Sequence, residues 1–274
     1  MNSVYELLRP LVTDDKVRLG DLEDGGYVIN RRTLEKTVLI SLGVGDNWSF
    51  EKDFLKHTGA DIYMFDASVR PMERMKKLIN LVIEIFSLFF WINVIKWPYK
   101  LKRQILKIKK YFYLYKSFSA FISQDKVYYF PKLVSNREND LHLEDIILEK
   151  VKVHDALFIK IDIDGDEYGL ENTLNRHSNK IAGLAIEFHD IDRKFNQFKE
   201  MIETLKDKYY ITHIHANNFS EYCELIETLT VFEISFINKE MYTGNPSYFQ
   251  SGIYTDSLLD YPCNSRWKEF VISY

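Results

Sequence analysis

The sequence predicts an α/β protein with a mostly parallel β-sheet and helices on both faces. Seven short apolar runs alternate with stretches of helical periodicity, which is typical of strand-helix-strand units. Polar residues follow several of these runs directly, at the strand ends where ligands collect in such sheets. With 274 residues, 46% of them hydrophobic, the chain can bury a sizeable core. We expect a single Rossmann-like domain, residues 1–274.

Each expected strand is a short apolar run of the kind that suits a strand buried on both faces. The runs are Val38–Leu42, Ile62–Phe65, Val127–Phe130, Ala156–Ile163, Ile181–Phe188, Tyr209–His215 and Phe232–Ile237. Helices are expected between them at Trp48–His57, Leu141–Lys152 and Lys194–Lys208.

An insertion, residues 69–123, separates the second and third expected strands and is too long for an ordinary crossover. Its apolar stretch, Leu78–Ile95, approaches the roughly 20 residues of a membrane helix. Glu84 lies near its middle, however, and the strands on both sides must join one sheet. We therefore expect no membrane span.

The second part of the insertion is basic and amphipathic. With lysines between them, apolar residues recur at spacings of three and four: Leu101, Ile105, Ile108, Phe112 and Tyr115. The formal charge from Ile85 to Gln124 is +8, so the remainder carries -12, since the whole chain carries -4. Such a helix either caps the sheet or a second subunit, as in a homodimer, or contacts a membrane surface or an anionic substrate.

The composition bears on partners and compartment. The net charge of -4 and the isoelectric point near 6.0 give no case for a nucleic-acid partner. Cys223 and Cys263 form neither a CxxC pair nor a disulfide framework, which favours a reducing cytoplasm. Because the first residues show no export signal, we expect a cytoplasmic protein.

Two strand ends predict a bound nucleoside cofactor. The first ends in Gly43 and Gly45, which permit a sharp turn and close backbone approach to a ligand. Asp66 closes the next run, at the spacing where a carboxylate can accept hydrogen bonds from both ribose hydroxyls. Because the turn lacks a third glycine and continues with Asp46, a pyrophosphate, and with it NAD, fits poorly. A glycine turn that only reverses the chain is the alternative.

Acidic and imidazole side chains follow three later strands. Asp162 and Asp164 alternate with isoleucines in IKIDIDGDEYG, so both carboxylates are expected on one side of a strand. The next two strand ends carry Glu187, His189, His213, His215, Asn217 and Asn218. We expect these ends to converge, either for general-base catalysis or for a divalent cation held by oxygen and imidazole ligands.

Near the N-terminus, the segment Arg18–Asn30 contains Asp24, Gly25, Gly26 and Tyr27 in sequence. Asp-Gly-Gly favours a hairpin turn. In the alternative interpretation, Gly26 and Tyr27 lie over the cofactor pocket.

Eight segments, taken in their order along the chain, are similar to those of a known family: RLGDLEDGGYVI, SLGVGDNWSFEKDF, MFDAS, IKIDIDGDEYG, AIEFHDI, HIHANN, FEISFINK and LDYPCN. In this order they resemble the FkbM-type branch of class I S-adenosylmethionine-dependent methyltransferases, over most of the chain outside the insertion. The resemblance implies a seven-stranded sheet in which Gly43 and Gly45 approach the methionine part of S-adenosylmethionine. It also implies that Asp66 holds the ribose and that the segment ending in Ser135 borders the adenine. Asp164 departs from the family, which usually has Glu there.

The resemblance further implies methyl transfer to a small polar acceptor, with oxygen favoured over nitrogen. Asp162 is the first candidate for positioning or deprotonating the acceptor, followed by His189 and His215. Asp162 and Glu187 are the candidate ligands of a divalent cation. The expected acceptor is a sugar or a phosphorylated or nucleotide-linked precursor of a surface polysaccharide. A noncatalytic protein that docks on a membrane or partner through the insertion is the alternative.

Overall fold

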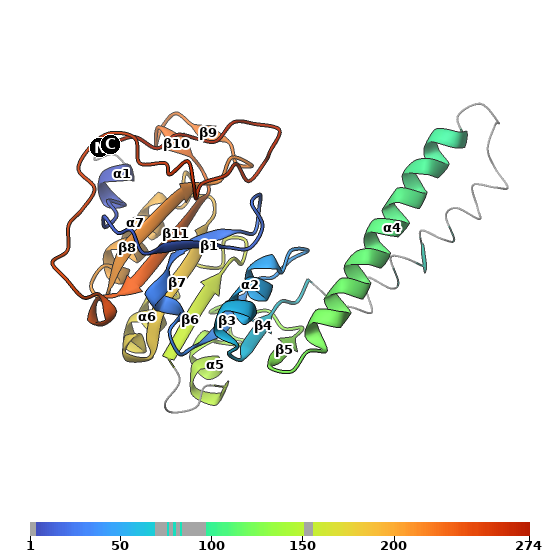
Figure 1. The fold of residues 1–274 in the computed structure, drawn as a ribbon, viewed down its shortest axis with the longest axis horizontal. Coiled ribbons are helices and arrows are strands. Elements are labelled where there is room, and N and C mark those ends of the chain that lie inside the picture. The colour runs from blue at the N-terminus through green and yellow to red at the C-terminus, as the bar shows by residue number, and fades with distance from the viewer. Residues whose placement is uncertain (1–3, 69–75, 77–78, 81–82, 84–96, 151–155) are drawn as a thin grey trace.

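The computed structural model describes residues 4–68, 76, 79, 80, 83, 97–150 and 156–274. Within these residues, seven strands form one sheet in the order β5-β4-β3-β6-β7-β11-β8, with helices over both faces (Figure 1). The predicted α/β fold, Rossmann-like and mostly parallel, is therefore confirmed.

The seven predicted strands are the seven strands of this sheet. In chain order they are β3 (Thr37–Leu42), β4 (Ile62–Phe65), β5 (Val127–Phe130), β6 (Ala156–Ile161), β7 (Ile181–Phe188), β8 (Tyr209–Ala216) and β11 (Phe232–Asn238). β11 lies antiparallel between β7 and β8, while the other pairings are parallel. All strands of the described sheet except β11 therefore share one direction.

One strand is shorter than predicted. β6 ends at Ile161, two residues before the expected end. The Asp162 N–H still donates a hydrogen bond to the Leu42 carbonyl, but Asp164 and Gly165 adopt positive φ angles of 49° and 96°. The left-handed conformation turns the chain out of the sheet. The prediction that Asp162 and Asp164 project together from a strand is therefore wrong.

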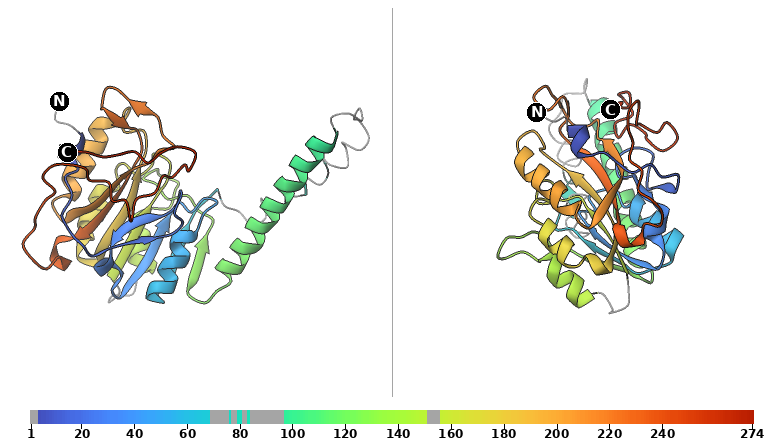
Figure 2. Two further views of the ribbon diagram at one scale, coloured as in Figure 1. Left: turned by 45° about the horizontal axis from the view of Figure 1, so that its top comes forward. Right: turned by 90° about the vertical axis from the view of Figure 1, so that its left-hand side faces the viewer.

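Helices lie over both faces of the sheet (Figure 2), and apolar side chains form a core on each face. One face is covered by α1 (Val4–Leu7), α5 (Leu143–Lys150), α6 (Glu171–Arg176) and α7 (Phe195–Leu205). The other is covered by α2 (Ser49–Thr58), one end of α4 (Trp97–Ile122) and the hairpin of β1 (Lys16–Leu19) and β2 (Tyr27–Asn30). The three predicted helices correspond to α2, α5 and α7, and the predicted Asp-Gly-Gly turn joins β1 to β2.

The helix α4 extends away from the sheet and touches it only near its C-terminal end (Figure 1). There the ring of Phe118 packs 4.9 Å from Trp48 and 5.0 Å from Tyr129, measured between centroids, and Phe121 is also buried. Farther out, Ile105 and Phe112 of the predicted apolar stripe are 40% and 53% exposed. The expected helix is present, but it does not cap the sheet along its length.

The apolar stretch Leu78–Ile95 lies almost entirely outside the described residues, so its predicted structure is not settled. Of the helices that are described, none is both long enough and apolar enough to cross a bilayer.

The C-terminal segment, residues 242–274, returns along the sheet and packs against β8 and β11. The Asp260 Oδ1 lies 2.7 Å from His213 Nε2, and Tyr254 Oη lies 3.2 Å from His213 Nδ1. A small hairpin of β9 (Tyr222–Cys223) and β10 (Thr228–Leu229) lies between β8 and β11 in sequence.

Candidate functional site

A cavity of about 350 Å³ lies beyond the carboxyl ends of β3 and β6, and we call it the switch-point cavity. Ligands of doubly wound sheets bind where the strand order reverses direction, which here is between these two strands. Its lining comes from the segments after β3, β4, β5 and β6, including Gly43, Gly45, Asp66, Leu133 and Asp162. The volume lies within the range of pockets that enclose small organic ligands.

Gly43 brings the end of β3 against the end of β6. Its φ is 75°, and a Cβ at this position would lie 1.6 Å from the Asp162 carbonyl oxygen. Its N–H donates to the Phe65 carbonyl at 2.9 Å, which fixes the turn to β4 as well. Only glycine permits this approach, so the predicted role of Gly43 in a tight turn is confirmed.

Asp66 is 8% exposed and uses both carboxylate oxygens within the protein. Oδ2 accepts hydrogen bonds from the N–H groups of Val44 and Gly45 at 2.8 and 2.7 Å. Oδ1 accepts from the N–H and the hydroxyl of Ser68, both at 2.6 Å. Burial raises the pKa of Asp66, but the hydrogen bonds from Ser68, Gly45 and Val44 outweigh it and hold the pKa below its ordinary value. Because a carboxylate offers about four lone-pair sites, a ribose hydroxyl must displace one of these donors.

A second cavity, of about 340 Å³, adjoins the first, and we call it the acid-lined cavity. Its lining contains four carboxylates among nine residues: Asp24, Asp162, Asp164, Glu187, His189, Asn217, Phe219, Ser220 and Val231. Asp162 and Asp164 line both cavities and so form their shared wall.

Asp162 is held between the two cavities by Tyr27 and Lys160. The Tyr27 hydroxyl lies 3.2 Å from Asp162 Oδ2 and 3.1 Å from Glu187 Oε2, so it can donate to either carboxylate. The Lys160 Nζ donates to the Gly43 carbonyl at 3.0 Å and to Asp162 Oδ2 at 3.3 Å. Burial lowers the pKa of Lys160, but the charges of Asp162 and other carboxylates raise it above its ordinary value. Lys160 therefore remains a buried cation that fixes the glycine turn to Asp162.

Glu187 is almost fully buried, and its environment disfavours the charged form. Asn217 Nδ2 donates to Glu187 Oε1 at 2.9 Å. Burial raises the pKa of Glu187 well above its ordinary value, and the neighbouring charges of Asp162 and Glu233 add to the effect. A raised pKa favours the protonated form, so this carboxyl group is a candidate for proton transfer.

His189 lies at the centre of the carboxylates. Its Nε2 is 4.0 Å from Asp162 Oδ1 and 3.9 Å from both Glu187 Oε1 and Asp164 Oδ1. Its Nδ1 is 3.5 Å from Oε1 of the buried Glu167. Burial lowers the pKa of His189, but Glu167, Glu187 and Asp162 together raise it to about 9. At neutral pH the imidazolium supplies positive charge and has no free nitrogen to accept a proton.

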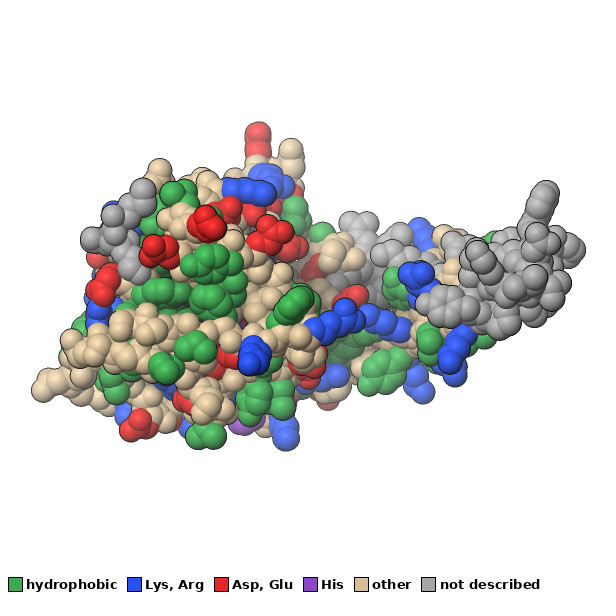
Figure 3. Space-filling view, turned by 90° about the horizontal axis from the view of Figure 1, so that it is seen from above, with side chains coloured by type: hydrophobic (Ala, Val, Ile, Leu, Met, Phe, Trp, Pro, Cys, Tyr) green, Lys and Arg blue, Asp and Glu red, His purple; other side chains and the backbone are tan. Residues whose placement is uncertain are grey.

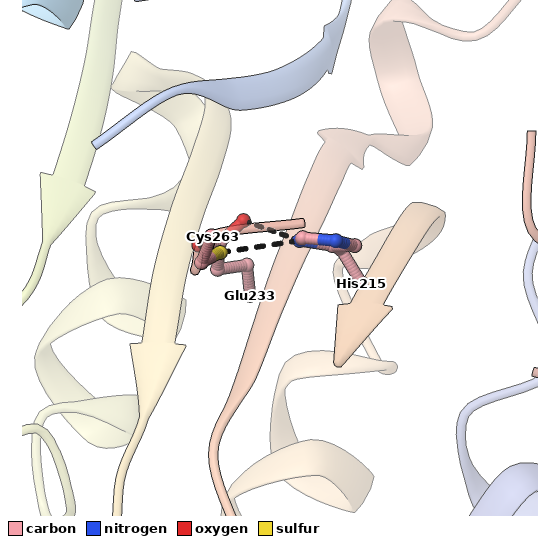
Figure 4. Close-up of side chains that lie close together, drawn as sticks. All are labelled: His215, Glu233 and Cys263. Atoms are coloured by element: carbon pink, nitrogen blue, oxygen red, sulfur yellow. Dashed lines mark hydrogen bonds and ion pairs between the residues drawn. The ribbon is translucent and has the colours of Figure 1, made fainter. Parts of the chain in front are cut away.

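His215 does not join this group, and the prediction that the three strand ends converge is wrong in this respect. β11 lies between β7 and β8, so Glu233 of β11 separates His215 from Glu187. His215 is 3% exposed and forms a separate buried cluster with Glu233 and Cys263 (Figure 4). Asn217, which directly follows the end of β8, does donate a hydrogen bond to Glu187.

Three residues predicted to bind the cofactor lie elsewhere. Gly26, Tyr27 and Ser135 are not among the described residues that line the switch-point cavity or the acid-lined cavity. The Ser135 hydroxyl is buried and donates to Asp140 Oδ2 at 2.6 Å, although its neighbours Leu133 and Val134 line the switch-point cavity. Tyr27 contacts the carboxylates instead, because the β1–β2 hairpin packs over β7 and β11.

The predicted metal ligands Asp162 and Glu187 lie with His189 so that one ligand atom of each falls within 4.8 Å of the others. Two carboxylates and an imidazole suit a divalent cation, which would act as a Lewis acid on an acceptor hydroxyl. The imidazolium of His189 already provides positive charge at the same position.

Lys160 was not predicted as a site residue, and Glu167 was predicted only as part of the acidic motif IKIDIDGDEYG. Lys160 lies in the apolar run of β6, and a lysine inside such a run is itself a signal, since buried lysines are paired. Glu167 is fully buried and accepts hydrogen bonds from the N–H groups of Gly165 and His189, both at 2.7 Å. These bonds tie the turn after β6 to the end of β7.

Fold and site together define a Rossmann-like α/β protein whose switch-point cavity opens beside an acid-lined cavity. Neither a protein-family profile nor a curated protein matches the sequence. Among solved structures, the chain is similar to a chain of a fibrillarin/Nop5p complex, with 8% identity, a TM-score of 0.35 and coverage of 74% of this chain and 73% of that one.

Two further structures are similar to a comparable degree. The precorrin-6y C5,15-methyltransferase of Geobacter metallireducens GS-15 has 12% identity and a TM-score of 0.34, over 76% of this chain and 87% of that one. The 23S rRNA methyltransferase ErmE has 6% identity and a TM-score of 0.36, over 78% of this chain and 69% of that one. At these scores the similarities bear on neither substrate nor mechanism, and the fold assignment rests on the strand order.

Proposed function

We propose that this protein is an S-adenosylmethionine-dependent methyltransferase that acts on a small polar acceptor. The observation that carries the proposal is the shared wall of Asp162 and Asp164 between the two cavities. Methyl transfer is an in-line displacement, so donor and acceptor must meet across a short distance. Two adjoining cavities of similar volume provide this arrangement.

The charges of the switch-point cavity favour S-adenosylmethionine over a dinucleotide. Asp66, Asp162 and Asp164 line the cavity, and a pyrophosphate would meet their negative charge. S-adenosylmethionine, when bound, supplies an electrophilic methyl group on a cationic sulfonium. The carboxylates of the shared wall stabilise such a cation.

The acid-lined cavity narrows the class of acceptor. Three aspartates and the buried Glu187 line this cavity and disfavour a phosphate inside it, so we propose that the reacting part of the acceptor is neutral or cationic. Phe219, 60% exposed at its edge, offers an aromatic surface on which the apolar face of a sugar ring can pack. We propose a sugar-like polyol as acceptor, with any phosphate or nucleotide group of a polysaccharide precursor outside the cavity.

The carboxylates suit an oxygen acceptor, because a hydroxyl must lose its proton as it attacks. Asp162 lies where it can orient the hydroxyl, and Glu187, whose pKa is raised, can take up the proton. Tyr27 bridges both carboxylates and Lys160 anchors Asp162. These contacts hold the side chains of Asp162 and Glu187 in place before the acceptor binds.

The proposal is tested with the full-length protein in two assays. Calorimetry should detect binding of S-adenosylmethionine and S-adenosylhomocysteine, and labelled methyl should pass to a member of a panel of neutral sugars, amino sugars and sugar phosphates. Asp162→Asn should lower the rate about 100-fold or more while S-adenosylhomocysteine still binds. The matched control is Asp166→Asn, since Asp166 pairs with Arg137 and lines neither described cavity. Absence of cofactor binding to the wild-type protein would refute the proposal.

A second function, docking on an anionic membrane surface, is favoured by the exposed side chains of α4. A hollow of about 430 Å³ is lined, among the described residues, by Lys102, Arg103, Leu106, Lys107 and Lys110. Figure 3 shows basic and apolar side chains along the extended helix, apart from the acidic side chains of the main body. Basic and apolar side chains on one helix suit an interface with anionic lipid.

Liposome flotation tests this second function. The variant with Lys102, Arg103, Lys107 and Lys110 changed to Gln should lose binding to vesicles rich in phosphatidylserine and keep methyl transfer. Retained binding would argue against docking through α4. A change from dimer to monomer without lipid, seen by light scattering, would favour the predicted homodimer instead.

A further inference from the structure

A buried cluster of His215, Glu233 and Cys263 lies outside both cavities (Figure 4). Each residue comes from a different part of the chain: β8, β11 and the C-terminal segment. Their exposed fractions are 3%, 4% and 1%. Imidazole, carboxylate and thiol are the side-chain types that bind zinc in proteins.

The spacing of the ligand atoms approaches that of a tetrahedral site. Glu233 Oε2 lies 2.9 Å from His215 Nδ1, and Cys263 Sγ lies 3.9 Å from the same nitrogen and 3.4 Å from Glu233 Oε1. With ordinary zinc–ligand bond lengths, a tetrahedron has edges of about 3.3 Å between nitrogen and oxygen and about 3.6 Å to sulfur. The edge to nitrogen involves Glu233 Oε2 and the edge to sulfur involves Oε1, so both carboxylate oxygens face the position of the ion. With Glu233 as a bidentate ligand, side-chain shifts of about half an ångström would bring these edges to tetrahedral lengths.

Glu269 holds the other side of the imidazole. Its Oε1 lies 3.0 Å from His215 Nε2, and its Oε2 is buried without a hydrogen-bond partner among the described residues. A carboxylate on the far nitrogen of a histidine is the usual support of a zinc-binding imidazole. Both ring nitrogens of His215 therefore lie beside a carboxyl group, and the cluster holds two carboxyl groups for one imidazole.

We propose that His215 Nδ1, Glu233 and Cys263 bind one zinc ion, with Glu269 accepting the Nε2–H. The N–H bond at Nδ1 and the S–H bond of Cys263 break, both protons leave to solvent, and bonds from zinc to nitrogen, sulfur and a Glu233 oxygen form. The zinc ion therefore replaces the two protons that now point at Glu233. The second Glu233 oxygen or a water molecule completes the coordination.

The ion would fasten the C-terminal segment to the sheet. Cys263 is the ligand from that segment, while His215 and Glu233 face each other on paired strands. Metal binding at such a site contributes directly to folding stability. This role does not depend on the proposed methyl transfer.

Cobalt substitution tests the site in the full-length protein. After removal of metal with a chelator, Co²⁺ should bind once per chain and give thiolate-to-cobalt charge-transfer absorption, and Zn²⁺ should displace it. Cys263→Ser should abolish the charge-transfer band, whereas the matched control Cys223→Ser should keep it, since Cys223 lies on β9 away from the cluster. Glu269→Gln should weaken zinc affinity about 10- to 100-fold.

Two results would overturn the proposal. The first is binding of Co²⁺ to the wild-type protein without a charge-transfer band. That result would mean that no thiolate binds the metal and would favour a site at Asp162, Glu187 and His189 instead. The second is the absence of Zn²⁺ binding to the wild-type protein in competition with a chromophoric chelator. If Cys263→Ser is insoluble, the wild-type spectrum and the Glu269→Gln affinity decide the question.

Discussion

At the scale of single residues, Glu187 shows a conflict between stability and function. It is buried beside Asp162 and Glu233, and burial and these charges raise its pKa, so the folded state disfavours its charged form. Glu187→Gln keeps an acceptor for the amide of Asn217 and removes the charge. We expect the variant to have a Tm a few degrees higher and a methyl-transfer rate about 100-fold lower. Calorimetric melting and single-turnover kinetics measure the two effects, and a lower Tm would contradict this account.

His189 predicts a dependence of stability on pH. Its pKa rises from 6.5 to about 9 on folding, because Glu167, Glu187 and Asp162 favour the imidazolium. The folded state therefore binds the proton more tightly, and this contribution is complete below pH 6.5 and disappears as the pH rises through 9. Its size is at most about 3 kcal/mol, since one pKa unit corresponds to about 1.4 kcal/mol.

The comparison of wild type with His189→Gln measures this contribution. Urea unfolding of both proteins between pH 6 and pH 9.5 should show a stability difference that shrinks as the pH rises. His57, which is exposed on α2, provides the matched control variant His57→Gln. A difference that is constant across the range would show that His189 is not the titrating group.

At the scale of elements, the turn between β3 and α2 offers a matched pair of glycines. A Cβ on Gly43 would lie 1.6 Å from the Asp162 carbonyl oxygen, whereas a Cβ on Gly45 would meet nothing within 4 Å. Both have positive φ, so the two alanine variants share the conformational cost of about 1–2 kcal/mol. Gly43→Ala should lose about 3 kcal/mol or more in total, because β3 and β6 must separate.

Urea unfolding gives the two free energies, and calorimetry with S-adenosylhomocysteine shows whether the cavity survives. Gly45→Ala should retain binding within about tenfold. Equal losses in the two variants would mean that backbone strain alone, without the close approach to Asp162, explains the need for glycine.

The strands were predictable because burial on both faces leaves apolar runs that few other structures produce. Ala156–Ile163 was overextended for a local reason: isoleucines alternate with aspartates up to Ile163, and only the positive φ of Asp164 ends the pattern. The tight turn after β3 was also predictable, since glycine is the residue that allows the close approach of Gly43 to the end of β6.

The arrangement of the candidate site was only partly predictable. His215 was grouped with Glu187 because β7 and β8 follow each other in the sequence and run in the same direction. In the sheet, however, β11 lies antiparallel between these two strands. That insertion depends on pairing across the whole sheet, which local patterns do not encode. Lys160 and Glu167 each contact a near neighbour, Asp162 and Gly165, but they also bind the Gly43 carbonyl and the His189 N–H. These two contacts between strand ends depend on the fold, and no local pattern indicates them.

At the scale of the whole molecule, ligand binding should stabilise the sheet and leave α4 unaffected. The switch-point cavity is lined by the segments after β3, β4, β5 and β6, and none of its lining residues belongs to α4. A ligand at 100 times its Kd adds about 2.7 kcal/mol to the stability of the folded state. S-adenosylhomocysteine should therefore raise the Tm and slow hydrogen exchange at Gly43, Gly45 and Asp66. Exchange in residues 102–113 of α4 should stay the same, because these side chains make little contact with the sheet. Equal protection of α4 would mean that the helix folds back over the bound ligand, and the proposal that α4 acts apart from the switch-point cavity would then be wrong.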